Sequence, residues 1–350
     1  MTERKHFIDN IRWMTLLLLF PFHTCIIYNN FGEGNYIRGS ESLILSNFTS
    51  ILWPWFMPLL FVIAGISSMY SLRKRTVKEY FLERIKKLFV PLFFGIIFIC
   101  PFLTFYAEKF HNNFTGTYFQ QYILFFTKET NLTGYNGGFT PAHLWFILYL
   151  LIISIIAIPF FRSIPKKIDN VITKMNLFTL IFLFIIPFIG HFILDIGGRS
   201  VGELFCYFVL GYYVFSNEVI MEKCSKYCWL LGIISIVSLS IYLFNNNIII
   251  HSIIQRLYGI CFISFLLGIG KIKLNCSNKI TEYFSNISFG IYLFHLSWIT
   301  IIAYYLMQYI SNIYIQAVII TFSSIPFTIL SVELLRRINI TCFMFGLKKK

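Results

Sequence analysis

The sequence has little charge. Only 13% of its 350 residues are Asp, Glu, Lys or Arg, whereas 57% are hydrophobic and 41 are Phe. A soluble domain of this length would carry far more charge on its surface, so the composition excludes a separate soluble domain. The repeated apolar runs, each of about 16 to 24 residues, match helices that cross a bilayer. We therefore expect a single all-α integral membrane domain over residues 1–350, located as a multi-pass protein in the cell membrane.

Several site motifs are also missing. The eight cysteines are scattered and form no CxxC pair, which argues against disulfides and against zinc, so we expect no bound metal. No HExxH, P-loop or GxSxG element occurs, and metalloprotease, nucleotide hydrolase and serine hydrolase functions therefore have no support. The first apolar run lacks a small-residue cleavage site, so we expect a retained span rather than a signal peptide.

The excess of basic residues is better explained by membrane orientation than by nucleic acid, and we expect no nucleic-acid partner. The net charge is +14, and the basic residues lie between apolar runs. Ten transmembrane helices can be drawn, at about 11–29, 48–70, 88–105, 143–161, 177–195, 201–217, 229–245, 250–270, 286–309 and 314–335. With the N-terminus inside, 24 of the 29 Lys and Arg are cytoplasmic and five are outside: Arg38, Lys109, Lys128, Arg199 and Arg256. This asymmetry predicts that both termini are cytoplasmic.

The first predicted span contains three ionisable residues, Asp9, Arg12 and His23. Eleven helical steps are almost three turns, so a continuous helix would place Arg12 and His23 on one face about 16 Å apart, with Asp9 on the same stripe. Ionisable groups are costly in hydrocarbon, and such a residue is a functional hypothesis by default. The pattern suits an anionic ligand that enters from one membrane face.

Six segments in order resemble the membrane acyltransferase-3 family, over residues 5–337. The first helix carries the family's Arg-ten residues-His motif, and its FPFH and following IIY look most like the branch that contains a glucan succinyltransferase. The segments are RKHFIDNIRWMTLLLLFPFHTCIIYN, WFMPLLFVIAGISSMYSLRKR, YFLERIKKLFVPLFFG, HLWFILYLL, FVLGYYVF and SFGIYLFHLSW. The chain stops after the tenth predicted helix, so we expect no fused extracellular esterase-like domain of the kind that some relatives carry.

The resemblance implies transfer of an acetyl or succinyl group from cytoplasmic acyl-CoA to a hydroxyl of a cell-envelope glycan or lipid-linked sugar. Acyl-CoA would be a donor substrate, with no permanently bound cofactor. The family makes Arg12 and His23 the essential pair, and Asp9 is expected to fix the direction of Arg12. His23 would be the general base that takes the proton of the sugar hydroxyl. A covalent acyl-histidine relay is the alternative.

The donor phosphates are expected to bind basic residues at the inner surface, and our candidates are Arg73, Arg75, Arg84 and Lys87. The alternative is that this basic segment only sets the topology. The family's Arg-x-x-Arg element corresponds here to Arg84 and Lys87, and the lysine keeps the charge but loses a bidentate fork.

Three further residues are candidates for the substrate site. His295 lies at a depth similar to that of His23, so we expect the two to meet, as a polar contact of the site or as a structural hydrogen bond. His143 and Trp145 open the fourth predicted span near the outer surface and are expected to contact the acceptor sugar or to anchor the helix at the interface. The outer segment 106–142, rich in Gly, Asn, Thr and Tyr, suits a lid or acceptor-binding loop.

Two other functions compete with the enzyme. A transporter or flippase for a glycan or lipid-linked intermediate also fits ten helices with polar groups near the midplane, although no inverted repeat is visible. A membrane sensor or scaffold without activity is the third. The sequence leaves the oligomeric state open.

Overall fold

The computed structural model describes residues 5–161, 166–196, 198–245 and 247–350. About 75% of the chain is helical, with almost no strand, as the apolar composition predicts. The chain packs as two compact units: unit 1 is 1–15, 50–84 and 149–285, and unit 2 is 16–49, 85–148 and 286–350. Four helices cross a border between the units: α1 (His6–Leu17), α3 (Leu43–Leu52), α9 (Trp145–Ile156) and α18 (Lys279–Leu306).

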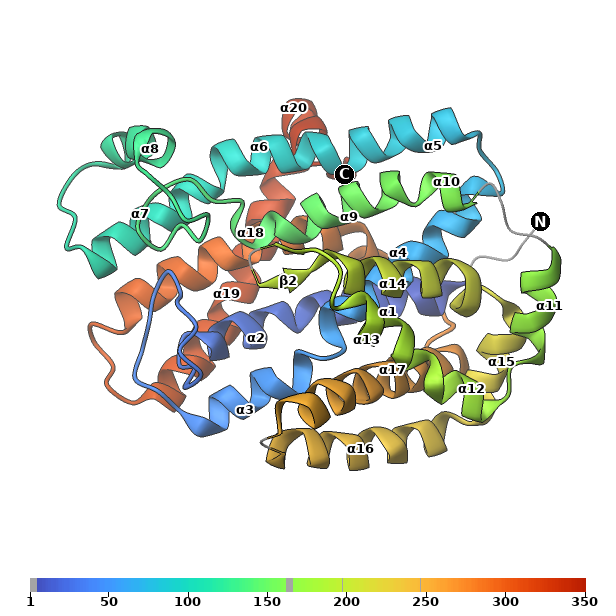
Figure 1. Ribbon diagram of the computed structural model, residues 1–350. Helices are drawn as coiled ribbons and strands as arrows, with labels where there is room; N and C mark the ends of the chain where they lie inside the picture. The colour runs from blue at the N-terminus through green and yellow to red at the C-terminus, as the bar shows by residue number, and fades with distance from the viewer. Residues whose placement is uncertain (1–4, 162–165, 197, 246) are drawn as a thin grey trace. The chain divides into compact units, whose positions relative to one another are not determined.

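Unit 1 contains most of the central part of the chain. Its complete elements are α4 (Phe56–Leu72), α5 (Val77–Arg84), α10 (Ile158–Phe161), α11 (Lys166–Lys174), α12 (Leu177–Ile181), η3 (Phe182–Phe184), α13 (Ile185–Gly190), β1 (Asp195–Ile196), β2 (Arg199–Ser200), α14 (Val201–Leu210), η4 (Gly211–Phe215), α15 (Glu218–Lys226), α16 (Cys228–Phe244) and α17 (Ile248–Lys273). The strands form a two-stranded antiparallel hairpin that pairs Asp195 with Ser200 and Ile196 with Arg199. Figure 1 shows α16 and α17 side by side.

Glycine lets the helices of unit 1 approach closely. A Cβ on Gly65 of α4 would lie 2.0 Å from the carbonyl oxygen of Phe208, and a Cβ on Gly211 would lie 2.1 Å from that of Val62. Small residues at such a crossing allow backbone-to-backbone packing, which is the main source of helix association where water provides no driving force. These two glycines therefore fix α4 against α14 and η4.

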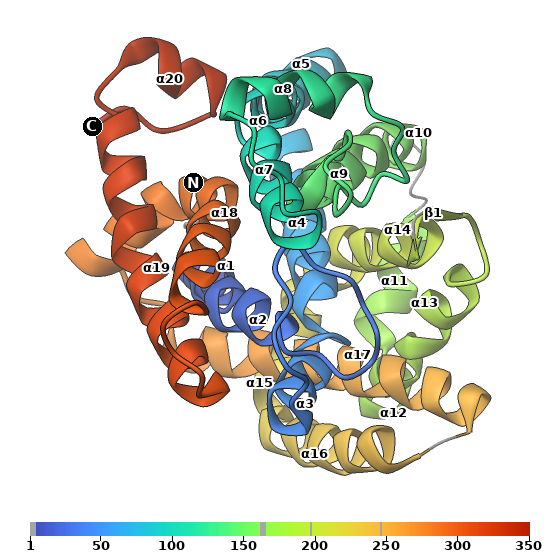
Figure 2. The same ribbon diagram turned by 90° about the vertical axis from the view of Figure 1, so that its left-hand side faces the viewer.

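Unit 2 contains the candidate histidines. Its complete elements are α2 (Leu19–Ile26), η1 (Ile85–Phe89), α6 (Val90–Phe98), α7 (Cys100–His111), α8 (Tyr118–Thr127), η2 (Ala142–Leu144), α19 (Ile313–Leu335) and α20 (Asn339–Met344). In Figure 2, α2 lies beside α18 and α19. A buried apolar cluster joins Tyr36, Leu103 and Ala107 to Leu296 of α18. This packing buries Leu296, the residue that follows His295 on α18.

The prediction of ten transmembrane helices is not confirmed. In the described part of the chain, five helical segments are long and apolar enough to cross a membrane: Leu43–Leu72, Val77–His111, Ile248–Lys273, Lys279–Leu306 and Ile313–Leu335. A sixth is obtained if 201–215 and 218–226, which are bent by 94° at their junction, count as one span. Three other apolar helices are shorter, at Ala142–Ile156, Leu177–Gly190 and Cys228–Phe244. The multi-pass membrane class is supported, and the cytoplasmic location of both termini stays a prediction.

The first predicted span is divided into α1 and α2 at a single residue, Leu18. α1 ends at Leu17 and α2 begins at Leu19. The break has a local cause, because Pro21 has no N–H to donate to the carbonyl of Leu17. The hydrogen-bond ladder of the first span is therefore interrupted at Leu18, although this residue keeps helical φ and ψ angles of −66° and −12°. The shared face inferred for Arg12 and His23 stays a prediction.

Candidate active site

Three histidines meet in unit 2. His23 comes from α2, His143 from η2 and His295 from α18. The ring centroids of His23 and His295 are 5.1 Å apart, and those of His143 and His295 are also 5.1 Å apart. His295 is fully buried and His143 is 5% exposed, whereas His23 is half-buried. The meeting of His23 and His295 expected from their depths is confirmed, although it does not establish a role for either.

Backbone carbonyls fix the tautomers of two of these rings. Nδ1 of His295 lies 2.7 Å from the carbonyl oxygen of Tyr292, and Nε2 of His143 lies 2.9 Å from that of Leu293. A carbonyl only accepts, so each of these nitrogens carries the hydrogen in the neutral ring. The second nitrogen of each ring then holds a lone pair. In the described part of the chain, neither Nε2 of His295 nor Nδ1 of His143 has a hydrogen-bond partner, and both are buried.

The two orphaned nitrogens are among nine buried side-chain atoms of the described residues that have no hydrogen-bond partner, and these two belong to neighbouring rings. Buried polar atoms are nearly always paired, and each exception calls for an explanation. Both orphans are acceptors, and both belong to rings of one cluster. The arrangement can therefore receive a hydrogen from a hydroxyl or an N–H group that enters the cluster.

The position of His143 is held by α18 and by its own loop. The hydroxyl of Tyr292 donates to the carbonyl oxygen of His143 at 2.6 Å, so α18 binds both the ring and the backbone of this residue. The preceding residue, Ala142, has a φ of +49°, which a residue with a Cβ rarely adopts. Its N–H donates to Oγ1 of Thr140 at 2.9 Å. Strained backbone of this kind persists only where the surroundings fix it, and it clusters at functional sites.

The outer segment 106–142 is an ordered structure and not an open loop. α8 begins with a capping box between Thr117 and Gln120. Gln121 is buried and donates to the carbonyl of Gly137 at 2.8 Å, and Thr140 donates to that of Leu132 at 2.7 Å. Its role as a lid or acceptor-binding loop stays a prediction.

Arg12 is fixed within unit 1. Its guanidinium lies 3.1 Å from the carboxylate of Asp9 and donates to Oγ of Ser67 on α4 at 2.9 Å. The expected pairing of Asp9 with Arg12 is therefore confirmed as a contact. Arg12 and His23 belong to different units.

The four predicted donor-binding residues have different surroundings. Arg73 lines a pocket of unit 1, and its guanidinium lies 5.9 Å from the ring centroid of Tyr70. Arg75 forms an ion pair with Glu83. The guanidinium of Arg84 lies 4.6 Å from the ring centroid of Tyr80, and Lys87 is exposed in the π-helical η1. Trp145, which was predicted to contact the acceptor sugar, packs edge-on against Phe146 with ring centroids 6.4 Å apart.

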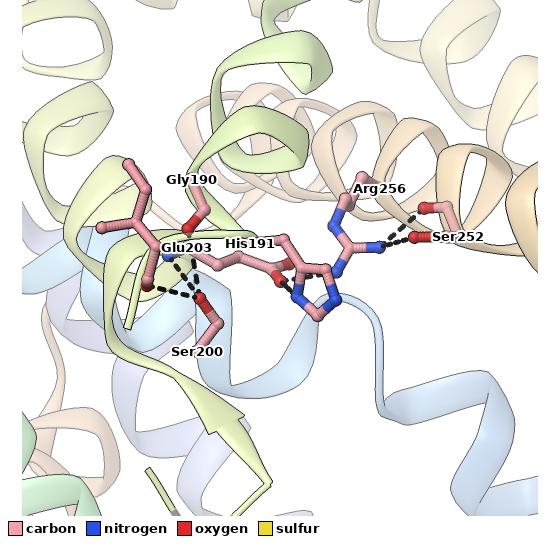
Figure 3. A network of polar contacts seen from close by, with 7 residues as sticks. Gly190, His191, Ser200, Glu203, Ser252 and Arg256 are labelled. Carbon is pink, nitrogen blue, oxygen red and sulfur yellow. Dashed lines mark hydrogen bonds and ion pairs between the residues drawn. The ribbon is translucent and has the colours of Figure 1, made fainter. Parts of the chain in front are cut away.

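A charged network in unit 1 was not predicted as a site. Arg256 on α17 is 4% exposed, and it donates to Glu203 of α14 at 2.6 Å and to the carbonyl and hydroxyl oxygens of Ser252 at 2.8 and 2.6 Å. The ring of His191 lies 3.1 Å from the same carboxylate oxygen of Glu203, and Figure 3 shows these side chains converging. The signal was present, because each charged residue interrupts an apolar run. The sequence did not indicate that Glu203 and Arg256, which are 53 positions apart, form an ion pair.

Metal ligation is not indicated by this geometry. In residues 5–161, 166–196, 198–245 and 247–350, no group of three His, Cys, Asp or Glu side chains is placed to hold a metal ion.

Comparisons with known proteins point to one kind of activity. A family model described as an acyltransferase domain matches residues 5–335. Glucans biosynthesis protein C of Shigella dysenteriae is 22% identical over 382 residues, an alignment that covers 98% of this chain and 94% of the relative. The protein of the same name from Salmonella gallinarum is 24% identical over 351 residues, with 88% and 86% covered. No solved structure matches the chain.

Proposed function

Since the chain belongs to the acyltransferase-3 family and is an acyltransferase of non-aminoacyl groups, we propose that it acylates a hydroxyl of a cell-envelope carbohydrate from cytoplasmic acyl-CoA. The relatives' name connects them with glucans, so a glucan is the first acceptor to test. An acetyl or succinyl group is the expected cargo. The observation that supports this function most directly is the histidine cluster, with its two buried and unpaired acceptor nitrogens.

His23 is the general base of the proposed reaction. The sugar hydroxyl attacks the thioester carbonyl, the new C–O bond forms, and His23 takes the hydroxyl proton. The C–S bond then breaks, and the proton on His23 passes to the departing thiolate, which leaves as free CoA. A neutral imidazole has the right basicity to take and return one proton.

His295 and His143 act as positioning residues in this proposal. Their free nitrogens accept hydrogen bonds from the incoming hydroxyl or from an N–H of His23. Holding both groups in one orientation lowers the entropic part of the barrier. Transfer through an acyl-His23 intermediate uses the same residues and remains the alternative chemistry.

Substitution of His23 tests the function. Membranes or purified protein carrying His23→Ala are expected to lose acyl transfer by about 100-fold or more, the usual contribution of general acid–base catalysis. His251→Ala is the matched control, since this ring packs on Tyr242 in unit 1 at 4.4 Å and lies outside the cluster. Mass spectrometry of envelope glycans measures the product. Unchanged acylation in His23→Ala would refute the enzyme, and glycan export without any acyl product would favour the carrier.

The tautomers make a second test possible, because Asn and Gln reproduce different ring nitrogens. At His295 the acceptor is the ε nitrogen, so His295→Gln should retain more activity than His295→Asn. At His143 the acceptor is the δ nitrogen, and the order should reverse, with Asn better than Gln. If each ring served only to keep its hydrogen bond to a backbone carbonyl, the order would be the opposite at both positions: Asn would be better than Gln at His295, and Gln better than Asn at His143.

A further inference from the structure

A pocket of about 600 Å³ lies in unit 1, where the ends of several segments meet. Lys5 precedes α1, Arg73 follows α4, Glu218 begins α15 and Lys271 lies in the last turn of α17. Asn275 adds a neutral polar group. In the predicted topology all of these residues are at the cytoplasmic surface.

Two lysines of the pocket converge on one carboxylate. Nζ of Lys271 lies 2.5 Å from one oxygen of Glu218, and Lys5 binds the other oxygen. Burial opposes the charge of Lys5, but its hydrogen bonds to Glu218 and Tyr70 outweigh this effect and hold its pKa above the ordinary value. Lys5 is therefore a cation at neutral pH. The Glu218 side chain is 51% exposed, so solvent reaches it beside the two lysines.

Arg73 supplies a third cation. In the described part of the chain no ion pair joins it to a carboxylate, and its guanidinium lies 5.9 Å from the ring centroid of Tyr70. The second acid of the pocket, Asp169, already accepts a hydrogen bond from Asn217 at 3.1 Å. Three cations thus face two carboxylates, and one of those carboxylates bridges two of the cations.

We propose that this pocket binds the phosphates of the coenzyme A part of the acyl donor, with Lys5, Lys271 and Arg73 as ligands and Glu218 as the carboxylate that the phosphates displace. The proposal rests on the proposed function, in which the donor is acyl-CoA. It adds Lys5 and Lys271 to the predicted donor-binding residues. Glu218 then competes with the phosphates for these two lysines.

The size and charge of the pocket fit this ligand. A volume of about 600 Å³ is within the range of sites for small molecules and cofactors. Charge-assisted hydrogen bonds to phosphate are stronger than neutral ones, so converging Lys and Arg side chains are a suitable phosphate site. A carboxylate that occupies the same cations must be released before phosphate binds, and it therefore lowers the apparent affinity. Removing its charge should consequently strengthen binding.

Calorimetric titration of the purified full-length protein with coenzyme A tests the proposal. Arg73→Ala and Lys271→Ala should each weaken binding about tenfold, which corresponds to about 1.4 kcal/mol. Lys74→Ala and Lys273→Ala are the matched controls, because these exposed lysines lie one and two positions away and outside the pocket lining. They should stay within about twofold of wild type. Glu218→Gln should bind several-fold tighter, whereas Glu222→Gln, also exposed, should not change.

The probes separate this assignment from its alternatives. Pantetheine, which lacks all the phosphates, should not bind measurably, and coenzyme A should bind more weakly at high salt. Equal affinities in Arg73→Ala, Lys271→Ala and their controls would overturn the pocket assignment while leaving His23 chemistry intact. Binding of phosphatidylglycerol vesicles by a protein that does not bind coenzyme A would overturn the assignment and identify a lipid headgroup site. His23→Ala that binds coenzyme A normally but does not transfer would leave both proposals standing.

Discussion

The buried ion pair between Glu203 and Arg256 gives a prediction whose magnitude follows from the structure. Glu203→Leu removes the carboxylate at 2.6 Å and leaves the Arg256 guanidinium, which is 4% exposed, without its counter-charge. Breaking a buried pair by removing one partner costs about 3–5 kcal/mol, because the remaining charge stays desolvated. We expect a loss of unfolding free energy in that range, reduced by the bonds that Arg256 keeps to Ser252.

The double variant Glu203→Leu with Arg256→Met should recover most of that loss. Replacing both partners by apolar groups removes the desolvated charge and is often close to neutral. The control is Glu41→Leu, since Glu41 pairs with Arg38 at 3.0 Å but both side chains are at least 35% exposed. An exposed pair contributes about 0–1 kcal/mol.

Unfolding in mixed micelles measures these differences. All eight cysteines are free and five of them are buried, so a thiol-reactive fluorophore reports the loss of packing. A double variant as unstable as Glu203→Leu would refute the reasoning, and so would a Glu203→Leu variant no less stable than Glu41→Leu.

Three further predictions concern packing, positioning and pH. Gly65→Ala should destabilise unit 1 by at least about 1–3 kcal/mol in the same assay, because the added Cβ would lie 2.0 Å from a backbone oxygen; wild-type stability would contradict the glycine crossing. Tyr292→Phe removes the 2.6 Å hydrogen bond to the carbonyl of His143 and should lower kcat more than it raises KM, whereas unchanged kinetics would show that this bond does not position the ring. Burial tends to raise the pKa of Glu218, but its hydrogen bonds to Lys5 and Lys271 outweigh burial and lower the pKa. The stability that the Glu218 carboxylate contributes is therefore present above the ordinary carboxyl pKa of 4.5, and it is lost as the pH falls through the lower pKa of the folded protein. The stability difference between wild type and Glu218→Gln should therefore shrink in acid, and a difference independent of pH would contradict it.

The sequence predicted the class of the protein well. Low charge and long apolar runs predicted a helical membrane protein, and the six motifs predicted the acyltransferase-3 family; the helical class and the family are both confirmed. The local contacts three residues apart, Asp9 with Arg12 and Glu333 with Arg336, were also predictable, since helical spacing alone brings such side chains together. The roles of the predicted site residues stay predictions.

Helix continuity was harder to predict from composition. Apolar content is the same on either side of a break, so the runs counted as ten spans did not show where proline or a turn would divide them. Pro21 is present in the sequence, but the sequence does not show how far the loss of its hydrogen bond to the Leu17 carbonyl disturbs the helix around it.

The sequence by itself determined which residues can titrate within apolar segments and which chemistry they can perform, because burial of an ionisable group is costly wherever the chain folds. Only the tertiary structure decided their partners. His143 and His295 are 152 positions apart, and their tautomers depend on carbonyls that α18 presents to them. Lys5 and Glu218 meet across 213 positions for the same reason: contacts between distant segments depend on how helices pack, and hydrophobic periodicity specifies a buried face without specifying its neighbour.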